Sequence, residues 1–68
     1  MMASTPLPLR LLRRLEAVEA GTHTPSAPLD WPDADLVAEG LIEVRHDRGR
    51  SWAEITEKGR EALRGSRG

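Results

Sequence analysis

Cysteine is absent from this chain of 68 residues, and that absence restricts how so small a fold can be stabilised. A domain of this size buries only about 60% of the surface that its unfolded chain exposes, and its core rarely contributes more than roughly 3–5 kcal/mol net. Disulfides and thiolate metal sites are excluded. The two histidines, His23 and His46, lie far apart in turn-like contexts, so no structural metal is expected. We therefore expect one domain that can gain stability from self-association or from docking onto a partner.

The first predicted element is a helix over residues 6–20. Thr5 can cap its free N–H groups, and Pro6 needs no hydrogen bond at the first helical position. Gly21 is suited to end the helix in the left-handed conformation. The prediction depends on an apolar stripe with spacings of four, four and three: Leu7, Leu11, Leu15 and Val18.

A second, shorter helix is predicted to begin at about residue 31. Residues 22–28 are rich in Thr, Ser and Pro, which indicates a loop. Asp30 can cap the helix and Gly40 stops it, so the helix has about nine residues and depends on tertiary packing. Trp31 is assigned to the core. It shares an apolar face at helical spacing with Ala34, Val37 and Ala38.

A β-hairpin and a third helix complete the predicted order. Alternation turns Ala53 and Ile55 toward the core and Trp52 to the other face. Thr56 is expected to cap the last helix, which buries Leu63. The two strands and the polar loop of about five residues between them are predicted over 41–45, 51–55 and 46–50, respectively.

This order, helix-helix-strand-strand-helix with a two-stranded antiparallel hairpin, is an α+β fold that is mainly α. Residues 36–43 (LVAEGLIE) and 53–63 (AEITEKGREAL) resemble winged-helix regulators of the MarR and PadR type. The resemblance implies a minimal winged-helix domain over residues 6–64, with a disordered start at 1–5 and a disordered tail at 65–68. Only residues 22–39 are available for a helix-turn-helix. We therefore expect a shortened form, with one helix and at most a helical turn before it.

Charge is strongly segregated along the chain although the net charge is only −1. Residues 1–15 carry +3, residues 16–43 carry −7 with no base, and residues 44–68 carry +3. The resemblance implies transcription regulation, with the second helix in the major groove and the hairpin wing on the DNA backbone. The carboxylates near the start of that helix repel phosphate and lack the Arg, Lys, Asn or Gln of base readout. They are Asp30, Asp33 and Asp35.

The first functional hypothesis is therefore a small DNA-binding regulator that contacts double-stranded DNA mainly through the wing. Wing arginines could neutralise phosphates, and arginines of the first helix could extend the patch. Three phosphate contacts give a salt slope of about −2.7, a roughly 40-fold loss of affinity from 50 to 200 mM salt. A solvated loop is the simpler reading of the same wing. The candidate residues are Arg45, Arg48, Arg50, Arg10, Arg13 and Arg14.

The alternative is a protein–protein interaction module that presents the acidic second helix and Trp52. Its candidate contacts are Trp52, Asp33 and Asp35, and its partner is a second copy or another protein. Exposed tryptophans often anchor interfaces, but Trp52 could instead fold over the hairpin or pack against Trp31. No catalytic constellation, metal site or cofactor motif is present, so an enzyme is not expected. No apolar run is long enough to span a membrane, and the cytoplasm is the expected location.

Overall fold

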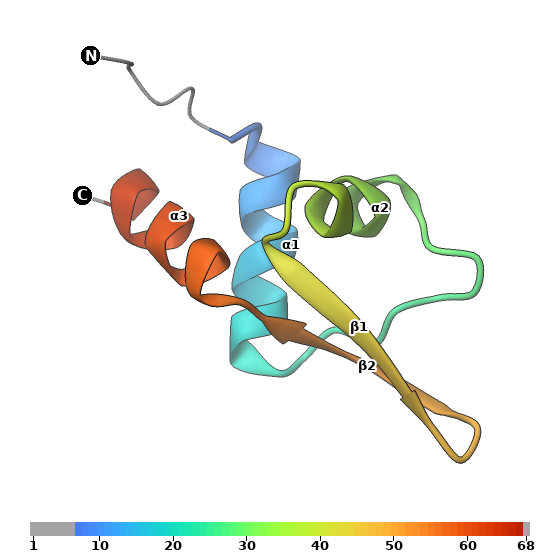
Figure 1. Cartoon of the computed structure of the whole chain (residues 1–68). Helices are drawn as coiled ribbons and strands as arrows, with labels where there is room; N and C mark the ends of the chain where they lie inside the picture. The colour runs from blue at the N-terminus through green and yellow to red at the C-terminus, as the bar shows by residue number, and fades with distance from the viewer. Residues whose placement is uncertain (1–6, 68) are drawn as a thin grey trace.

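The computed structural model describes residues 7–67 and confirms the predicted order of three helices and two strands. Figure 1 shows the three helices gathered at one end and the hairpin extending from them. The molecule is elongated, with principal extents of 44 × 19 × 18 Å. The elements are α1 (Leu9–Ala20), α2 (Trp31–Ala38), β1 (Ile42–Asp47), β2 (Arg50–Ile55) and α3 (Glu57–Arg67).

Helix α1 begins at Leu9, later than predicted, because Pro8 takes the N-cap position with extended backbone. The predicted cap Thr5 and the predicted disordered start at 1–5 lie outside the described residues. Gly21 ends the helix in the left-handed conformation, with φ of 76°, as predicted. The buried side of α1 consists of Leu11, Leu15 and Val18.

Helix α2 is capped as predicted, because the Asp33 backbone N–H donates to the Asp30 carboxylate at 3.2 Å. It ends at Ala38, and residues 22–30 contain no helical turn. The segment between α1 and β1 therefore holds one helix only. α2 packs on α1 on one side and on β1 on the other.

The hairpin turn is tighter than predicted. β1 and β2 pair from Ile42 opposite Ile55 to Asp47 opposite Arg50, which leaves a two-residue turn in place of a five-residue loop. Arg48 and Gly49 both have positive φ, 51° and 79°, the conformation of a type I′ turn that follows the twist of the strands. The paired part of the hairpin is therefore longer than expected.

Helix α3 starts where predicted. The Gly59 backbone N–H donates to the Thr56 hydroxyl at 3.0 Å, and that hydroxyl donates to the Gly40 carbonyl at 2.7 Å. Thr56 thus caps α3 and ties its start to the end of α2. The helix continues to Arg67, so the tail predicted at 65–68 is helical as far as the structure describes it.

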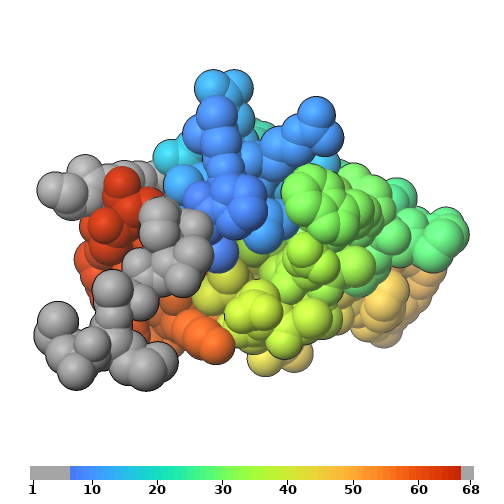
Figure 2. Space-filling view, turned by 90° about the horizontal axis from the view of Figure 1, so that it is seen from above, coloured from blue at the N-terminus to red at the C-terminus, as the bar shows by residue number. Residues whose placement is uncertain are grey.

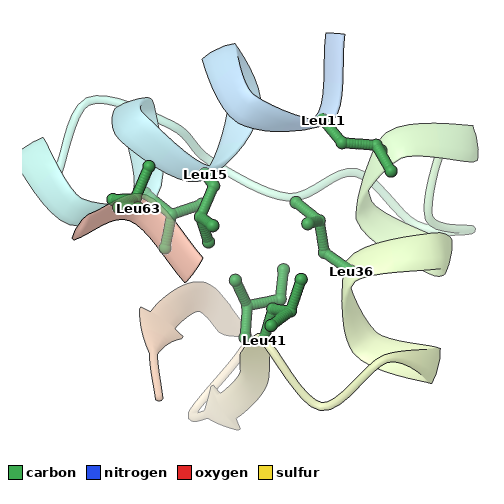
Figure 3. Packing of buried hydrophobic residues seen from close by; sticks show 7 residues of the cluster. Leu11, Leu15, Leu36, Leu41 and Leu63 are labelled. Carbon is green, nitrogen blue, oxygen red and sulfur yellow. The ribbon is translucent and has the colours of Figure 1, made fainter. Parts of the chain in front are cut away.

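The core lies where the three helices meet the base of the hairpin. Figure 3 shows leucines from α1, α2, α3 and the α2–β1 junction turned toward one another. Seen from above, α1 lies between α2 and α3 (Figure 2). The assignment of Trp31 to the core is wrong, because that side chain is 48% exposed. The buried apolar residues are Leu11, Leu15, Val18, Leu36, Leu41, Ile42 and Leu63.

None of the helices in the described part of the chain is long and apolar enough to cross a membrane.

Candidate interaction surfaces

A buried carboxylate organises the polar contacts between α1, α2 and the loop before α2. Asp33 is fully buried, with an exposure of 0%. One of its oxygens accepts from Arg14 Nη1 at 2.8 Å, and the other lies 2.7 Å from His23 Nε2. The same Arg14 nitrogen contacts both oxygens of Asp30 at 3.0 Å. One arginine therefore joins α1 to the cap and the first turn of α2.

The proton positions of this cluster follow from its geometry. His23 Nε2 lies 3.3 Å from Arg14 Nη1 and 2.7 Å from the Asp33 carboxylate. A guanidinium only donates and a carboxylate only accepts, so the shorter contact places the hydrogen on Nε2, donating to Asp33. Every polar atom buried in the described side chains then has a partner.

The electrostatics of the cluster favour the charged forms of Arg14 and Asp30. Hydrogen bonding to Asp33 raises the pKa of Arg14 despite partial burial. The hydrogen bond from Arg14 holds the pKa of Asp30 below its usual value. Asp33 and Arg14 are thus structural. Complete burial makes the prediction of Asp33 as a protein contact wrong, and Arg14 is already engaged by two carboxylates.

Sequence reasoning assigned no role to His23, which closes the cluster from the loop. The partners of Asp33 lie ten and nineteen residues before it in the chain. No local periodicity links such positions, so only the tertiary fold reveals them.

On the solvent face of the hairpin, two glutamates neutralise the charge of Arg45. Arg45 donates from Nε to Glu54 and from Nη2 to Glu43, both at 2.9 Å. Trp52 lies opposite Arg45 and donates from Nε1 to Glu54 at 2.9 Å. The bond from Trp52, followed by that from Arg45, lowers the pKa of Glu54. Trp52 is 38% exposed, in keeping with the hypothesis that placed it on the surface. Its indole Nε1, however, is held within the hairpin by the hydrogen bond to Glu54.

Two arginines remain available at the hairpin tip. Arg48 and Arg50 are exposed, and neither makes a salt bridge with any described residue. Asp47 lies directly opposite Arg50 and partly offsets its charge. The tip therefore carries a small net positive charge, smaller than the three wing arginines predicted from the sequence.

The arginines of α1 form a second, separate patch. Arg10 and Arg13 are exposed and border an open hollow of about 310 Å³ together with Arg14 and Pro32. The first turn of α1 lies at the opposite end of the molecule from the hairpin turn (Figure 1). The arginines of α1 therefore do not extend the wing patch.

The outward face of α2 is apolar, and we define it by Trp31, Ala34, Val37 and Ala38. All four are exposed, and Trp31 is the most prominent large apolar side chain on the helix. The inward face is formed instead by Asp33 and Leu36, both with 0% exposure. Asp35, a predicted contact, is exposed on the same helix, and Glu39 follows at its C-terminal end. This apolar face with acidic neighbours carries no basic group.

An open hollow of about 460 Å³ lies between α2 and β1. Its apolar lining comes from Val37 of α2 and from Ile42 and Val44 of β1. Glu43 and Arg45 border it with their charged side chains. The hollow thus lies beside the outer edge of the hairpin.

Residues 7–67 contain no group of three or more His, Asp or Glu side chains that could hold a metal ion. No family model, no curated protein and no solved structure matches this chain. Its function is therefore inferred from the surfaces described above.

Proposed function

We propose that this chain is a protein-binding module that docks a partner on the outward face of α2. The observation that carries the proposal is the 48% exposure of Trp31 at the start of an apolar face that the core leaves uncovered. A few residues supply most of the free energy of protein association, and tryptophan is enriched among them. Ala34 and Ala38 are small and let a partner chain approach α2 closely.

Charge indicates what kind of partner fits this face. Residues 16–43 contain no Lys or Arg, and Asp35 and Glu39 are exposed beside the apolar residues. A complementary partner presents apolar side chains flanked by Lys or Arg, because opposite charges at the rim favour encounter and orientation. An amphipathic helix with basic flanks has this chemistry, and it could lie along the outward face of α2.

The scaffold that we propose is a shortened winged helix. The element order and the hairpin directly after α2 support it, as do the two sequence stretches that resemble the MarR and PadR type. In such a scaffold α2 takes the place of the DNA-reading helix. Its exposed residues offer no Arg, Lys, Asn or Gln for base edges or phosphates. The same position serves a protein partner instead.

Selection from a displayed library of helical peptides tests the proposal. We expect the recovered peptides to combine apolar positions with basic flanks, and Ala34→Glu to abolish their binding. Ala20→Glu is the matched control, because Ala20 is also exposed but lies at the end of α1. Replacing Trp52 by Phe leaves Trp31 as the single tryptophan, and its fluorescence should shift to the blue on binding. Peptides that bind the Ala34→Glu variant equally well would contradict the proposal.

A second candidate function is weak binding of double-stranded DNA by the hairpin tip. It is favoured by the exposure of Arg48 and Arg50 at the end of an extended hairpin. Two phosphate contacts give a salt slope of about −1.8, or a roughly 12-fold loss of affinity from 50 to 200 mM salt. Titration of a labelled duplex should show this dependence in the wild type and lose it in Arg48→Ala/Arg50→Ala. Equal binding by both proteins would exclude the tip as the contact.

A further inference from the structure

The outer edge of β1 is open. β1 pairs with β2 on one side, and within residues 7–67 no strand lies on its other side. An open edge presents unpaired N–H and C=O groups and is a template for another strand. β1 contains no proline, which would interrupt such pairing, and the hollow of about 460 Å³ beside it leaves space for an added chain. The side chains of β1 determine which strand can pair with this edge.

We infer that β1 pairs antiparallel with β1 of a second copy of this chain, around a two-fold axis at Val44. Residues directly opposite in an antiparallel pair share one face of the sheet. With Val44 opposite Val44, Glu43 of each copy lies opposite Arg45 of the other copy. The axis therefore produces two identical pairs of opposite charge on the solvent face and one apolar contact on the inner face. A contact of this kind is closed, because both copies use the same surface.

The atoms needed for these pairs are available. Arg45 uses Nε for Glu54 and Nη2 for Glu43 within its own hairpin, and its Nη1 makes no hydrogen bond to a described residue. Glu43 uses Oε1 for Arg45, which leaves Oε2 to accept from outside. Both side chains are more than half exposed. The intramolecular pairs thus hold the two groups in place and leave one donor and one acceptor for a second copy.

Neighbouring registers are less favourable. An axis at Glu43 or at Arg45 places two like charges directly opposite each other, which destabilises a strand pair. An axis at His46 pairs Arg45 with Asp47, but it moves the contact toward the hairpin tip and sets Val44 opposite Arg48. The axis at Val44 alone combines opposite charges with an apolar centre. This inference uses the edge of the hairpin and does not depend on a partner binding to α2.

Sedimentation velocity of the full chain over a range of concentrations tests the contact. We expect a monomer–dimer equilibrium that Glu43→Arg weakens about tenfold or more, because two attractive pairs become repulsive. Arg45→Glu should do the same, and the double variant Glu43→Arg/Arg45→Glu should restore the dimer because the charges are exchanged. A wild type that stays monomeric at every concentration overturns the inference. Dimerisation that neither single variant weakens overturns it as well.

Thiol cross-linking tests the register. The chain has no cysteine, so Val44→Cys introduces a single thiol that lies next to its own counterpart across the axis. Mild oxidation should convert this variant into a disulfide-linked dimer. Ala53→Cys is the matched control, because Ala53 lies opposite Val44 on β2, on the same face and equally half-buried. Equal cross-linking of the two variants, with circular dichroism showing both folded, contradicts pairing through β1. Failure of peptide binding at α2 would leave this result unchanged.

Discussion

Asp33 stabilises the junction between three segments of the chain because its two oxygens point to different partners. Arg14 from α1 approaches one oxygen and His23 from the loop approaches the other. Burying a carboxylate is unfavourable unless it is paired and hydrogen-bonded. Here both conditions hold, so α2 is fixed against α1 at a defined rotation. That rotation turns Asp33 and Leu36 inward and leaves Trp31 outside.

Replacement of Asp33 by Asn should lower the free energy of unfolding by about 2–3 kcal/mol. Removal of one partner of a buried pair commonly costs about 3–5 kcal/mol. The smaller value is expected because Arg14 keeps Asp30 and is 23% exposed. Urea unfolding followed by circular dichroism measures the change. Asp35→Asn is the matched control on the exposed side of α2 and should alter stability by less than about 0.5 kcal/mol.

The lowered pKa of Asp30 makes the stability of the folded protein depend on pH. The hydrogen bond from Arg14 lowers the pKa of this carboxyl in the folded protein below the ordinary value of 3.8. A lowered pKa contributes stability that is present above about pH 4 and is lost as the pH falls through the folded value. Asp30→Asn keeps the capping ability of the residue and removes its charge. The variant should therefore be less stable than wild type at pH 7, with a difference that shrinks below pH 4 in urea titrations. A constant difference would mean that the charge of Asp30 is not involved.

At the scale of elements, sequence patterns predict that a helix or strand exists better than they predict which of its faces is buried. The capping of α2 by Asp30 and of α3 by Thr56 follows from local chemistry and is confirmed. The stripe on α2 has helical spacing, but an eight-residue helix is positioned by its tertiary contacts. Its hydrophobic face therefore need not be its buried face. The hairpin turn escaped prediction for another reason, since Arg48 adopts a positive φ that favours Asn, Asp or Gly.

The glycine of the ITEKG stretch has a packing role that only the structure reveals. A Cβ on Gly59 would meet the Leu41 carbonyl oxygen and lie 2.7 Å from Ile55 Cγ1. Both belong to the base of the hairpin, and the Leu41 carbonyl accepts from the Thr56 backbone N–H at 3.0 Å. Helix α3 therefore crosses the hairpin base at a distance that only glycine permits.

Gly59→Ala should destabilise the protein although alanine favours helices. The clash involves backbone, so relief requires α3 to move, at a cost of typically about 1–3 kcal/mol. Gly65→Ala is the matched control in the same helix, because nothing lies near its added Cβ. That variant should be neutral or more stable by up to about 1 kcal/mol. Thermal unfolding of both variants gives the comparison, and equal melting temperatures would show that α3 adjusts freely.

At the scale of the whole molecule, the distribution of arginines weakens the DNA hypothesis. Of the six arginines predicted to contact DNA, Arg14 and Arg45 are held by carboxylates of the same chain. Arg10 and Arg13 belong to α1, whose first turn lies at the opposite end of the molecule from the hairpin turn (Figure 1). Charge is segregated along the sequence, but folding pairs Arg14 with Asp30 and Asp33, and Arg45 with Glu43, all carboxylates of the acidic block. Composition could not predict this, because the partners of each arginine depend on the tertiary fold.

The small core limits how large a loss of folding free energy the protein can tolerate before it unfolds. Leu15 is fully buried where α1 meets the other helices (Figure 3), whereas Leu9 on the same helix is 63% exposed. Leu15→Ala removes buried contacts and leaves a cavity in the core, and such changes cost about 2–5 kcal/mol. The core of a domain of this size rarely supplies more than roughly 3–5 kcal/mol net.

We therefore expect Leu15→Ala to be largely unfolded at 25 °C, with a loss of helical circular dichroism signal. The free energy of unfolding of Leu9→Ala should lie within about 0.5 kcal/mol of the wild-type value, because the Leu9 side chain is already mostly exposed to water. If Leu15→Ala folds stably when concentrated and unfolds on dilution, association supplies the missing free energy, since binding to the folded state alone stabilises it by mass action. Combining Leu15→Ala with Glu43→Arg would then remove that rescue. A Leu15→Ala variant that is stably folded even when dilute would contradict the small-core argument itself.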